Sequence, residues 1–514
     1  MYMTQGLHRA LASWPDRVMT VCGSRKRTFA TVAERVARLA GGLRQLGVQR
    51  GDRVAMLALN SDRYSEYLLA VPWADAVLNP VNIRWSPQEI SYSLVDSGTT
   101  VLLVDDAFAP LLPAIRAGAP DLATVVYCGE EHIPDGMVGF EDLIALDLPL
   151  EDARRGGDDL AGIFYTGGTT GFPKGVMLSH ANLTVSVLGS LATGYLMDED
   201  SVSLHAAPMF HLADFATWYA QLMVGGTHVF VPAFDPVAVL QAIDTHRVTD
   251  MLLVPVMVQL LLDHPAVGEY DLSCVRGILY GAAPISEALL ARALTVFEGA
   301  GFTQAYGMTE VAPIATLLGP RDHRAGRLRS AGRAAPHSEV RVVDADGRVA
   351  DPGTVGEVVV RGGHAMLGYW NRPDDTAAAV RDGWMHTGDG GYLDADGYLY
   401  IVDRIKDMIV SGGENVYSAE VENAIAEHPD VAACAVIGVP DPEWGERVHA
   451  VLVCRPGCEL TLEDVRAHTK SLIAGYKAPR SLDVVAALPV SGAGKILKRQ
   501  LREQYWTDTT RQVN

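Results

Sequence analysis

The sequence predicts an α/β protein. Its large N-terminal domain would contain layered α/β subdomains and a small β-barrel-like part, and a small, mobile α+β domain would follow. Three observations predict this. Short buried strands alternate with helical periodicity up to about residue 330, which favours largely parallel sheets between helical layers. The pattern then changes to short alternating strands separated by Asp-Gly turns. A compact α/β pattern of about a hundred residues ends the chain.

The amino-acid composition limits which classes of protein this chain can belong to. The 514 residues are 48% hydrophobic and 20% charged, which is typical of a packed globular protein with two to four domains at roughly 150 residues each. The 42 basic and 62 acidic residues give a formal charge of −20, which argues against nucleic acid as the main partner. Six scattered cysteines without a Cys-X-X-Cys pair predict reduced thiols rather than a disulfide framework or a zinc site.

Hydropathy predicts neither a secretory signal nor a membrane span. The first eighteen residues contain no apolar core, and no apolar run reaches the ~18 residues that a spanning helix needs. The most apolar candidate, residues 67–78, is interrupted by Pro72 and Asp75. We therefore expect a cytoplasmic protein without a transmembrane segment, and the oligomeric state, a homo-oligomer included, stays open.

The elements follow in chain order. Apolar, β-branched runs predict buried strands at residues 54–59, 100–104, 124–128, 162–165, 251–254 and 278–280. Helical periodicity follows at residues 256–262 and 286–296. Alternation predicts antiparallel hairpins or a small barrel with strands at residues 340–343, 357–361 and 398–402.

The last part of the chain predicts a separate small domain. Its expected helices are residues 418–426 and 462–472, and its expected strands are residues 431–437, 448–454 and 482–485. We therefore expect a large domain over residues 1–403, a boundary at 404–407 and a small domain over 408–514.

One loop carries the strongest chemical signal. Residues 165–175 read Tyr-Thr-Gly-Gly-Thr-Thr-Gly-Phe-Pro-Lys-Gly, after a predicted strand and before a helical segment from about residue 182. Backbone N–H groups of such a glycine-rich loop bind anions, and threonine hydroxyls and Lys174 add further donors. A flexible linker is the simpler alternative. A Walker A loop is excluded, because Pro173 precedes the lysine and Gly175 stands where that motif requires Ser or Thr.

This loop resembles the phosphate loop of the adenylate-forming (ANL) superfamily, and in particular its AMP-dependent acyl-CoA synthetase and fatty-acid–CoA ligase family. Further motifs of that superfamily are matched, in the family order, by residues 306–310, 385–389, 403–415 and 492–498. Gly167 stands where many members carry Ser, as in members that activate fatty acids. Five matches in order make a chance resemblance negligible.

The resemblance implies an AMP-forming acyl-CoA ligase. The carboxylate of a small-molecule acid attacks the α-phosphate of ATP, giving an acyl-adenylate and pyrophosphate. The thiol of coenzyme A then displaces AMP, which leaves far more readily than oxide. The implied cofactors and co-substrates are ATP, Mg²⁺ and coenzyme A, and catalysis rests mainly on positioning and electrostatics.

The resemblance also implies roles for single residues. Thr169, Thr170 and Lys174 would hold the β- and γ-phosphates. Thr309 would contact the α-phosphate, and Glu310, with Thr170, would bind Mg²⁺. The other implied nucleotide contacts, which surround the ribose, the base and the phosphates, are Thr166, Gly168, Gly171, Gly281, Ala282, Ala283, Gln304, Tyr306, Asp389 and Arg404.

The small domain carries a second group of implied roles. Lys495 matches the lysine that bridges the carboxylate and the α-phosphate, and Lys406 falls at the hinge. Gly412 and Gly413 would line the pantetheine tunnel. Between residues 470 and 505 basic side chains outnumber acidic ones, which suits coenzyme A phosphates, although a solvated helix face explains Lys498, Arg499 and Arg502 equally well. The candidates for contact with coenzyme A are Arg480, Trp444 and Tyr476.

The acyl pocket is the least determined part. His211 matches the position that faces the substrate carboxylate, where amino-acid-activating relatives carry Asp; Asp214 lies one turn on. Apolar surroundings predict an apolar acid, fatty or aryl. Buried core and a structural histidine are the alternatives. The candidate pocket residues are His211, Phe215, Val254, Val256 and Ala282.

Three other functions stay open. An acyl-AMP ligase would load a carrier-protein thiol, but the insertion that such members often carry and a carrier domain are not seen in the sequence. A luciferase-type monooxygenase is a further possibility. A non-catalytic nucleotide or acyl-adenylate sensor would have little use for Lys495, so its retention beside Lys174, Glu310 and Asp389 favours an enzyme.

Overall fold

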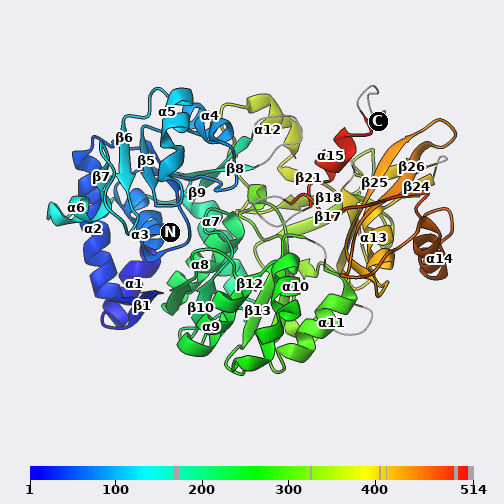
Figure 1. The fold of residues 1–514 in the computed structure, drawn as a ribbon. Coiled ribbons are helices and arrows are strands. Elements are labelled where there is room, and N and C mark those ends of the chain that lie inside the picture. Colours follow the sequence, from blue (N-terminus) through cyan, green and yellow to red (C-terminus); the bar gives the residue numbers. More distant parts are fainter. Residues whose placement is uncertain are drawn as a thin grey trace.

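A computed structural model describes residues 1–166, 173–283, 285–323, 327–404, 407–411, 414–490 and 496–506. Within these ranges the chain forms four β-sheets with helices packed around them, from the blue N-terminal part through the green centre to the orange and red C-terminal part (Figure 1). The predicted mixed α/β fold, with a large N-terminal part and a small α+β C-terminal part, is confirmed.

An eight-stranded sheet organises the N-terminal part of the described chain. Its strands, in spatial order, are β19 (Gly368–Tyr369), β9 (Lys174–Ser179), β8 (Leu160–Thr166), β4 (Val77–Pro80), β3 (Arg53–Leu57), β5 (Val101–Val104), β6 (Thr124–Tyr127) and β7 (Val138–Gly139). Pairing is parallel from β8 to β7 and antiparallel where β9 joins β8 and β19. The central parallel strands β4 and β5 are buried at every residue, as expected where helices cover both faces of a sheet.

A nine-stranded sheet lies next to it in the described chain. Its strands, in spatial order, are β16 (Arg333–Ala334), β15 (Thr316–Leu318), β14 (Gly301–Tyr306), β13 (Gly277–Gly281), β12 (Asp250–Leu253), β10 (Val202–His205), β11 (Thr227–Phe230), β1 (Val18–Cys22) and β2 (Arg25–Thr28). The central strands from β14 to β1 run parallel. The carboxyl ends of β13 and β14 therefore meet at one edge, where ligands bind in open α/β sheets.

Helices fill the layers around these two sheets, and α7 and α8 pack against each other at the centre of the molecule (Figure 1). They are α1 (Gln5–Ser13), α2 (Phe29–Gln45), α3 (Asp62–Trp73), α4 (Pro87–Ser97), α5 (Leu112–Gly118), α6 (Phe140–Ala145), α7 (His180–Leu191), α8 (Leu212–Val224), α9 (Pro236–His246), α10 (Pro255–Asp263), α11 (Glu287–Val296) and α12 (Pro373–Ala379). Most of the apolar run at 67–78 is part of α3, a fully buried core helix. Among the described helices, none has the length and hydropathy needed to cross a membrane.

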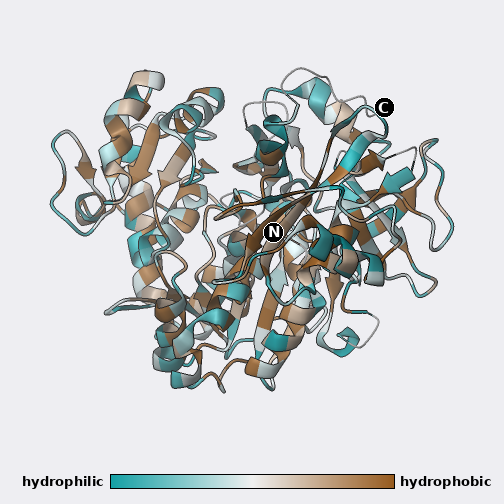
Figure 2. Ribbon diagram, turned by 45° about the vertical axis from the view of Figure 1, so that its right-hand side comes forward, coloured by the Kyte–Doolittle hydropathy of each residue, from teal (hydrophilic) through white to brown (hydrophobic). Residues whose placement is uncertain are grey.

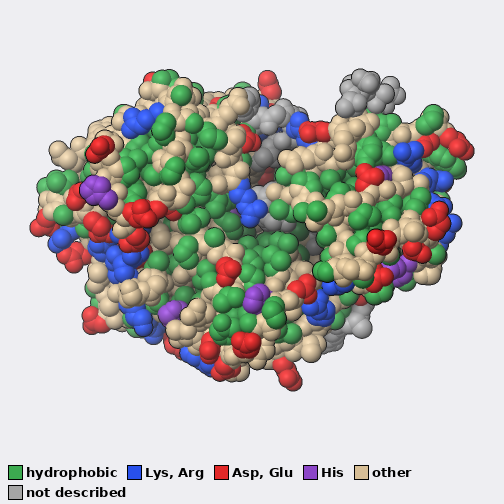
Figure 3. All heavy atoms as spheres, in the orientation of Figure 1, with side chains coloured by type: hydrophobic (Ala, Val, Ile, Leu, Met, Phe, Trp, Pro, Cys, Tyr) green, Lys and Arg blue, Asp and Glu red, His purple; other side chains and the backbone are tan. Residues whose placement is uncertain are grey.

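The interior is apolar and the surface is mixed in charge. The strands of the sheets are mostly hydrophobic in Figure 2, and the largest fully buried side chains include Trp218, Tyr64 and Tyr67. Acidic and basic side chains are interspersed over the face shown in Figure 3. The core therefore forms between the layers, as strand–helix alternation predicts.

The predicted antiparallel hairpins form a third sheet, which has five strands in the described chain. They are β17 (Glu339–Val343), β18 (Gly356–Arg361), β21 (Trp384–Leu393), β20 (Val380–Arg381) and β22 (Leu399–Arg404), the last of which pairs with β21. The glycines of the Asp-Gly turns have positive φ, with Gly347 at +79°, Gly383 at +77° and Gly397 at +79°. Glycine is favoured there because side chains strain that backbone region.

The fourth sheet contains the C-terminal strands. They are β24 (Glu414–Val416), β23 (Ile409–Ser411), β26 (Gly445–Cys454), β25 (Val431–Asp441) and β27 (Ser481–Val484), which pairs with β26. Helices α13 (Ser418–Ala426), α14 (Leu462–Leu472) and α15 (Lys498–Glu503) pack around it, and the first two begin and end at the predicted residues. The chain crosses from the third sheet to the fourth between Arg404 and Ile409, and Lys406, the expected hinge residue, lies outside the described residues.

Candidate active site

Three of the predicted nucleotide contacts meet around one buried carboxylate. The hydroxyl of Tyr306, at the end of β14, donates to Oδ2 of Asp389 over 2.8 Å. Asp389 on β21 faces Arg404 on β22, and the Arg404 Nε lies 3.3 Å from the other carboxylate oxygen. Burial, and then the charge of Asp389, raises the pKa of Tyr306 well above its usual value, so this phenol stays a donor. Each carboxylate oxygen has two lone pairs, so Asp389 can accept further hydroxyl donors.

The carboxyl ends of β13 and β14 form the wall beside this carboxylate. Gly281 pairs with Ala305, and a Cβ on Gly281 would lie 2.2 Å from the Ala305 carbonyl oxygen, so only glycine fits. Ala282 follows with a φ of +64°. Oε1 of Gln304, on β14, is buried and has no hydrogen-bond partner among the described residues. Buried acceptors are normally satisfied, so this oxygen suits an N–H donor on a ligand.

A chain of contacts joins the predicted metal ligand to the predicted phosphate lysine. Glu310 is buried in a 3₁₀ turn (Thr309–Val311), and its Oε1 accepts a 2.8 Å hydrogen bond from the hydroxyl of Tyr369. The Nζ of Lys174 lies 5.2 Å from the centre of the Tyr369 ring and 2.9 Å from Oδ1 of Asp375. Hydrogen bonding to Lys174 lowers the pKa of the Asp375 carboxyl. The sequence analysis missed Tyr369 and Asp375, because no motif marks them and only the fold brings them here.

Magnesium fits this arrangement through one carboxylate. Within the described ranges, no group of three or more His, Cys, Asp or Glu side chains could hold a metal ion. Mg²⁺ commonly binds through one or two carboxylates while substrate phosphates and waters complete its shell. The buried carboxylate of Glu310 meets that requirement.

The loop between β8 and β9 starts and ends at predicted contacts. Thr166 and Lys174 are paired across the hairpin, so the loop leaves the sheet at their edge. The expected helix begins at His180, after β9, a strand that the sequence analysis did not predict. The remaining predicted contacts of this loop and of the C-terminal part lie outside the described residues: Gly168, Thr169, Thr170, Gly171, Gly412, Gly413 and Lys495.

The predicted acyl-pocket residues are dispersed. His211 is the N-cap of α8, and its Nδ1 accepts the N–H of Ala213 over 3.2 Å. Asp214, one residue further, is buried with Oδ2 3.0 Å from Nδ1 of His205. Phe215 is fully buried, 5.4 Å from the ring of Phe164 on β8. Val254 is buried at the N-cap of α10, and Val256, in the first turn of that helix, is exposed.

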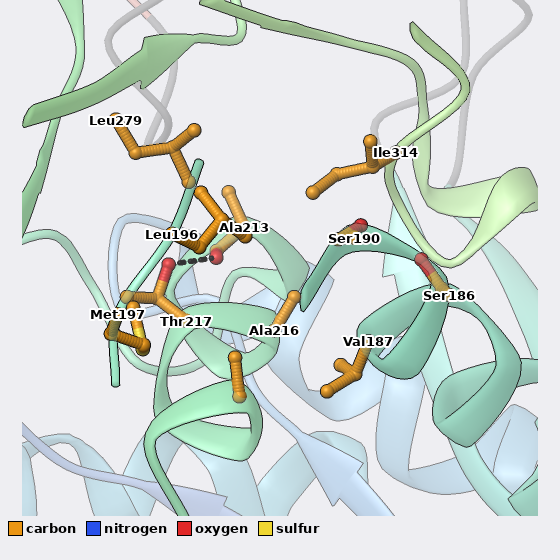
Figure 4. Close-up of a pocket in the computed structure, with 11 residues that line it drawn as sticks. Ser186, Val187, Ser190, Leu196, Met197, Ala213, Ala216, Thr217, Leu279 and Ile314 are labelled. Atoms are coloured by element: carbon orange, nitrogen blue, oxygen red, sulfur yellow. Dashed lines mark hydrogen bonds between the residues drawn. The ribbon is translucent and has the colours of Figure 1, made fainter. Parts of the chain in front are cut away.

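A cavity lies beside those residues, between α7 and α8 (Figure 4). Its volume is about 20 Å³, which is room for about one water molecule. Ala213, Ala216 and Thr217 of α8 face it, and Leu279 and Ile314 lie at its other side. None of the five predicted pocket residues is among the described residues that line it. Phe215 lies on the face of α8 turned toward the first sheet, where it packs against Phe164.

The candidate coenzyme A contacts lie on the C-terminal part. The guanidinium carbon of Arg480 lies 4.0 Å above the ring of Trp444, and Tyr476 is exposed. The expected basic field is weaker than the sequence suggests, since acids from elsewhere in the chain bind several of its cations. These pairs are Lys477 with Glu420, Lys498 with Glu422, and Arg502 with Asp407.

Sequence comparison shows which known proteins this chain is similar to. The family model described as AMP-binding enzyme matches residues 7–370, and that of the AMP-binding enzyme C-terminal domain matches residues 420–495. Feruloyl-CoA synthase of Amycolatopsis sp. is 41% identical over 507 residues, covering 97% of this chain and 99% of that protein. Fatty acid–[acyl-carrier-protein] ligase ScoC of Streptomyces coeruleorubidus is 37% identical over 511 residues, covering 97% and 96%.

A solved structure extends the comparison to the fold. ATP-bound MatB from Rhodopseudomonas palustris superposes with a TM-score of 0.89 at 31% identity, covering 99% of each chain. The match of the family model to most of the chain, together with these relatives, establishes what kind of protein this is. The chain belongs to the AMP-binding enzyme family of adenylate-forming proteins and is an AMP-forming acid–thiol ligase.

Proposed function

We propose that this protein is an acyl-CoA ligase that activates an apolar carboxylic acid, fatty or aryl, with ATP and passes the acyl group to coenzyme A. Two groups of contacts carry the proposal: Tyr306 and Arg404 with Asp389, and Tyr369 with Glu310 and Lys174. One cluster offers acceptors for hydroxyls, and the other offers a carboxylate and a cation for phosphates.

The nucleotide is held by groups of matched polarity. The ribose hydroxyls donate to Asp389, whose oxygens keep free lone pairs, while the ring of Tyr306 stacks on the base. The unpartnered Oε1 of Gln304 accepts from an amino group of the base. Glu310 holds Mg²⁺, which supplies positive charge to the phosphates when it is bound. Lys174, at the end of the hairpin loop, binds the outer phosphates.

Acid activation then proceeds by displacement at phosphorus. A carboxylate oxygen bonds to the α-phosphorus, the bond from that phosphorus to the bridging oxygen breaks, and pyrophosphate leaves. We assign to Lys495 the role of offsetting the repulsion between the two anions, and to Thr309 a contact with the α-phosphate. In the second half-reaction the thiolate of coenzyme A attacks the acyl carbon and AMP leaves.

We assign the two half-reactions to two arrangements of two domains. Residues 1–403 bind ATP and the acid, residues 408–514 carry Lys495, and residues 404–407 with Lys406 form the hinge. Gly412 and Gly413 line the path of the pantetheine arm. Arg480 and Trp444 hold the coenzyme A phosphates and base, and exposed Tyr476 is a further stacking surface.

The second candidate is transfer of the acyl group to a carrier-protein thiol. The 37% identity to ScoC, whose name describes such a ligase, favours it specifically. The two functions share the adenylation step and differ only in the thiol that displaces AMP.

A product assay with an acid panel tests the proposal. The purified protein is mixed with ATP, Mg²⁺, coenzyme A and C2–C18 or aryl acids, and AMP, pyrophosphate and thioester are measured. Equal amounts of AMP and acyl-CoA from an apolar acid support the proposal. Pyrophosphate and acyl-AMP without thioester support carrier loading, because AMP leaves only when an acceptor thiol attacks. No pyrophosphate with any acid contradicts both functions.

A further inference from the structure

The loop between β8 and β9 starts and ends at residues that contact each other. Tyr165 pairs with Gly175, and Thr166 pairs with Lys174. A Cβ on Gly175 would lie 2.7 Å from Cγ2 of Ile163 and 3.0 Å from Cζ of Tyr165, so the lack of a side chain lets the Tyr165 ring pack against the returning strand. Thr166 and Lys174 are predicted phosphate contacts. Whatever fixes Tyr165 and Gly175 therefore also fixes the neighbouring residues that are assigned to the phosphates.

Helix α4 holds the incoming end of this loop through one carboxylate. The hydroxyl of Tyr165 donates to Oδ2 of Asp96, in the last turn of α4, over 2.6 Å. Hydrogen bonds of this kind, from a hydroxyl to an ionised carboxylate, are shorter and stronger than those between neutral groups. Burial, and then the hydrogen bond with Asp96, raises the pKa of Tyr165, so its phenol keeps the proton that it donates.

The same residue of α4 also holds the returning end of the loop. The Asp96 carbonyl is one of the last four of the helix, which have no partner within the helix itself. It accepts from Nε1 of Trp370 over 2.9 Å and from Nδ2 of Asn371 over 3.2 Å. The backbone N–H of Trp370 in turn donates to the carbonyl of Gly175 over 2.8 Å. Asp96 is therefore bonded directly to β8 and, through Trp370, to β9.

The position of these two ends affects how well the loop can bind phosphates. A loop that becomes ordered only when its ligand binds loses affinity, because the cost of ordering is subtracted from the interaction energy. Hydrogen bonds that fix the ends of the loop beforehand lower that cost without touching the ligand. Because the loop is assigned to the outer phosphates, this contribution should appear for ATP, which has them, and not for AMP, which lacks them.

We propose that Asp96 and Tyr165 are positioning residues of the ATP site, which hold the phosphate loop in place through the hydrogen bond between their side chains. This inference rests on the proposed function, because it takes residues 166–174 as the loop that binds the outer phosphates of ATP. Neither side chain is assigned a contact with the nucleotide. Both act through Thr166 and Lys174, which are neighbours of the fixed residues in the chain.

Two nucleotides that differ in the outer phosphates test the proposal. Calorimetric titration gives the Kd of AMP and, with Mg²⁺, that of α,β-methylene-ATP, which cannot release pyrophosphate. In Tyr165→Phe and in Asp96→Ala we expect the Kd for α,β-methylene-ATP to rise about 3- to 10-fold, as for loss of one hydrogen bond, while the Kd for AMP stays within about 2-fold. The double variant Tyr165→Phe/Asp96→Ala should bind about as weakly as either single variant, because both changes remove the same bond.

Two further variants control for folding and for the chemistry of the contact. Tyr127→Phe removes a hydroxyl that donates to Asp106 near the other edge of the same sheet, and it should leave both Kd values unchanged. Asp96→Asn keeps a side-chain oxygen that accepts from Tyr165, so it should bind α,β-methylene-ATP more tightly than Asp96→Ala does.

The inference is overturned if the Kd for α,β-methylene-ATP is unchanged in both single variants, or if it rises as much in Tyr127→Phe. A rise in the Kd for AMP as large as that for α,β-methylene-ATP overturns it as well, because the loop would then not be the cause. In each case the ligase function stands as long as the native protein releases pyrophosphate with an apolar acid. No pyrophosphate with any acid contradicts the proposed function itself.

Discussion

Lys174 and Asp375 form an ion pair across the space between β9 and α12, with Nζ 2.9 Å from Oδ1. The same ammonium lies over the ring of Tyr369, whose hydroxyl binds Glu310. The lysine assigned to the phosphates is therefore already held by an acid of the chain, and its hydrogen bond lowers the pKa of Asp375. In the proposed function, the phosphates of ATP replace Asp375 as the partner of this ammonium.

Removing that competition should strengthen ATP binding. We expect Asp375→Asn to lower the KM for ATP about 2- to 5-fold, since partly exposed ion pairs contribute up to about 1 kcal/mol. Lys174→Ala should raise it. The matched control is Asp374→Asn, which changes an exposed acid on the same helix and should have no effect. An increase in KM for Asp375→Asn would show that the pair positions the lysine rather than restraining it.

Substitutions of Tyr306 and Asp389 should affect ATP binding to different extents. Asp389→Ala should raise the KM for ATP about 10- to 100-fold, because hydrogen bonds to a charged group contribute about 1.5–3 kcal/mol. Tyr306→Phe keeps the ring and removes only the hydroxyl, so its KM should change less than about 3-fold. Steady-state kinetics give the KM for ATP, and calorimetric titration should show that, in each variant, the Kd for AMP changes by a factor similar to that for the KM. Asp346→Ala, in an exposed turn, is the control, and equal losses in the two site variants would contradict the assignment.

Arg480 and Trp444 should act only in the second half-reaction. Arg480→Ala removes the guanidinium that stacks on Trp444, and we expect the KM for coenzyme A to rise about 10-fold, as for loss of one charge-assisted phosphate contact. Acid-dependent exchange between ATP and pyrophosphate should be unaffected. Lys470→Ala, which removes an exposed cation of the same basic segment, is the control. A loss of exchange in Arg480→Ala would place this residue in adenylation instead.

Stability should fall with acid because of a buried histidine. Burial lowers the pKa of His180 to about 4, and its Nδ1 accepts the N–H of Met3. Between about pH 6.5 and pH 4 the unfolded chain binds a proton that the folded chain does not, so the free energy of unfolding decreases as the pH falls, by up to about 1.4 kcal/mol per pH unit. Above about pH 6.5 this stabilisation is fully present.

Urea denaturation at pH 4.5 to 7.5 checks this expectation. His180→Gln should make the pH dependence below about pH 6.5 less steep by the contribution of one histidine, whereas His132→Gln, at an exposed position, should leave it unchanged. If the free energy of unfolding falls with pH equally steeply in the native protein and in His180→Gln, groups other than His180 cause the loss of stability in acid.

Local sequence signals predicted the elements well where their ends are marked. Helix α14 has a capping box, with the Thr461 side chain accepting from the N–H of Asp464 and the Asp464 carboxylate returning the contact. Such a signal is readable from residue types and spacing alone. The Asp-Gly turns of the third sheet are likewise predicted from two neighbouring residues. The β9 strand was missed because it is a short apolar run without alternation, which periodicity does not distinguish from a helix.

Contacts between distant segments could not be predicted. Tyr369 reaches Glu310 only because β19 pairs with β9, and the partner acids of the basic tail come from earlier parts of the chain. The sequence also does not predict which face of α8 lines the cavity. Side chains on all sides of this helix are buried, so no single apolar stripe distinguishes one face from the others. Phe215, for which both a pocket and a core position were expected, packs against Phe164.

The most direct test of the account is acid-dependent exchange of labelled pyrophosphate into ATP, measured without coenzyme A. If the acid attacks the α-phosphate before any thiol is present, exchange must occur with an apolar acid and Mg²⁺ alone, and it must fall about 10²- to 10³-fold in Lys495→Ala. No exchange with any acid, while thioester still forms once coenzyme A is added, would contradict an adenylate intermediate at this site.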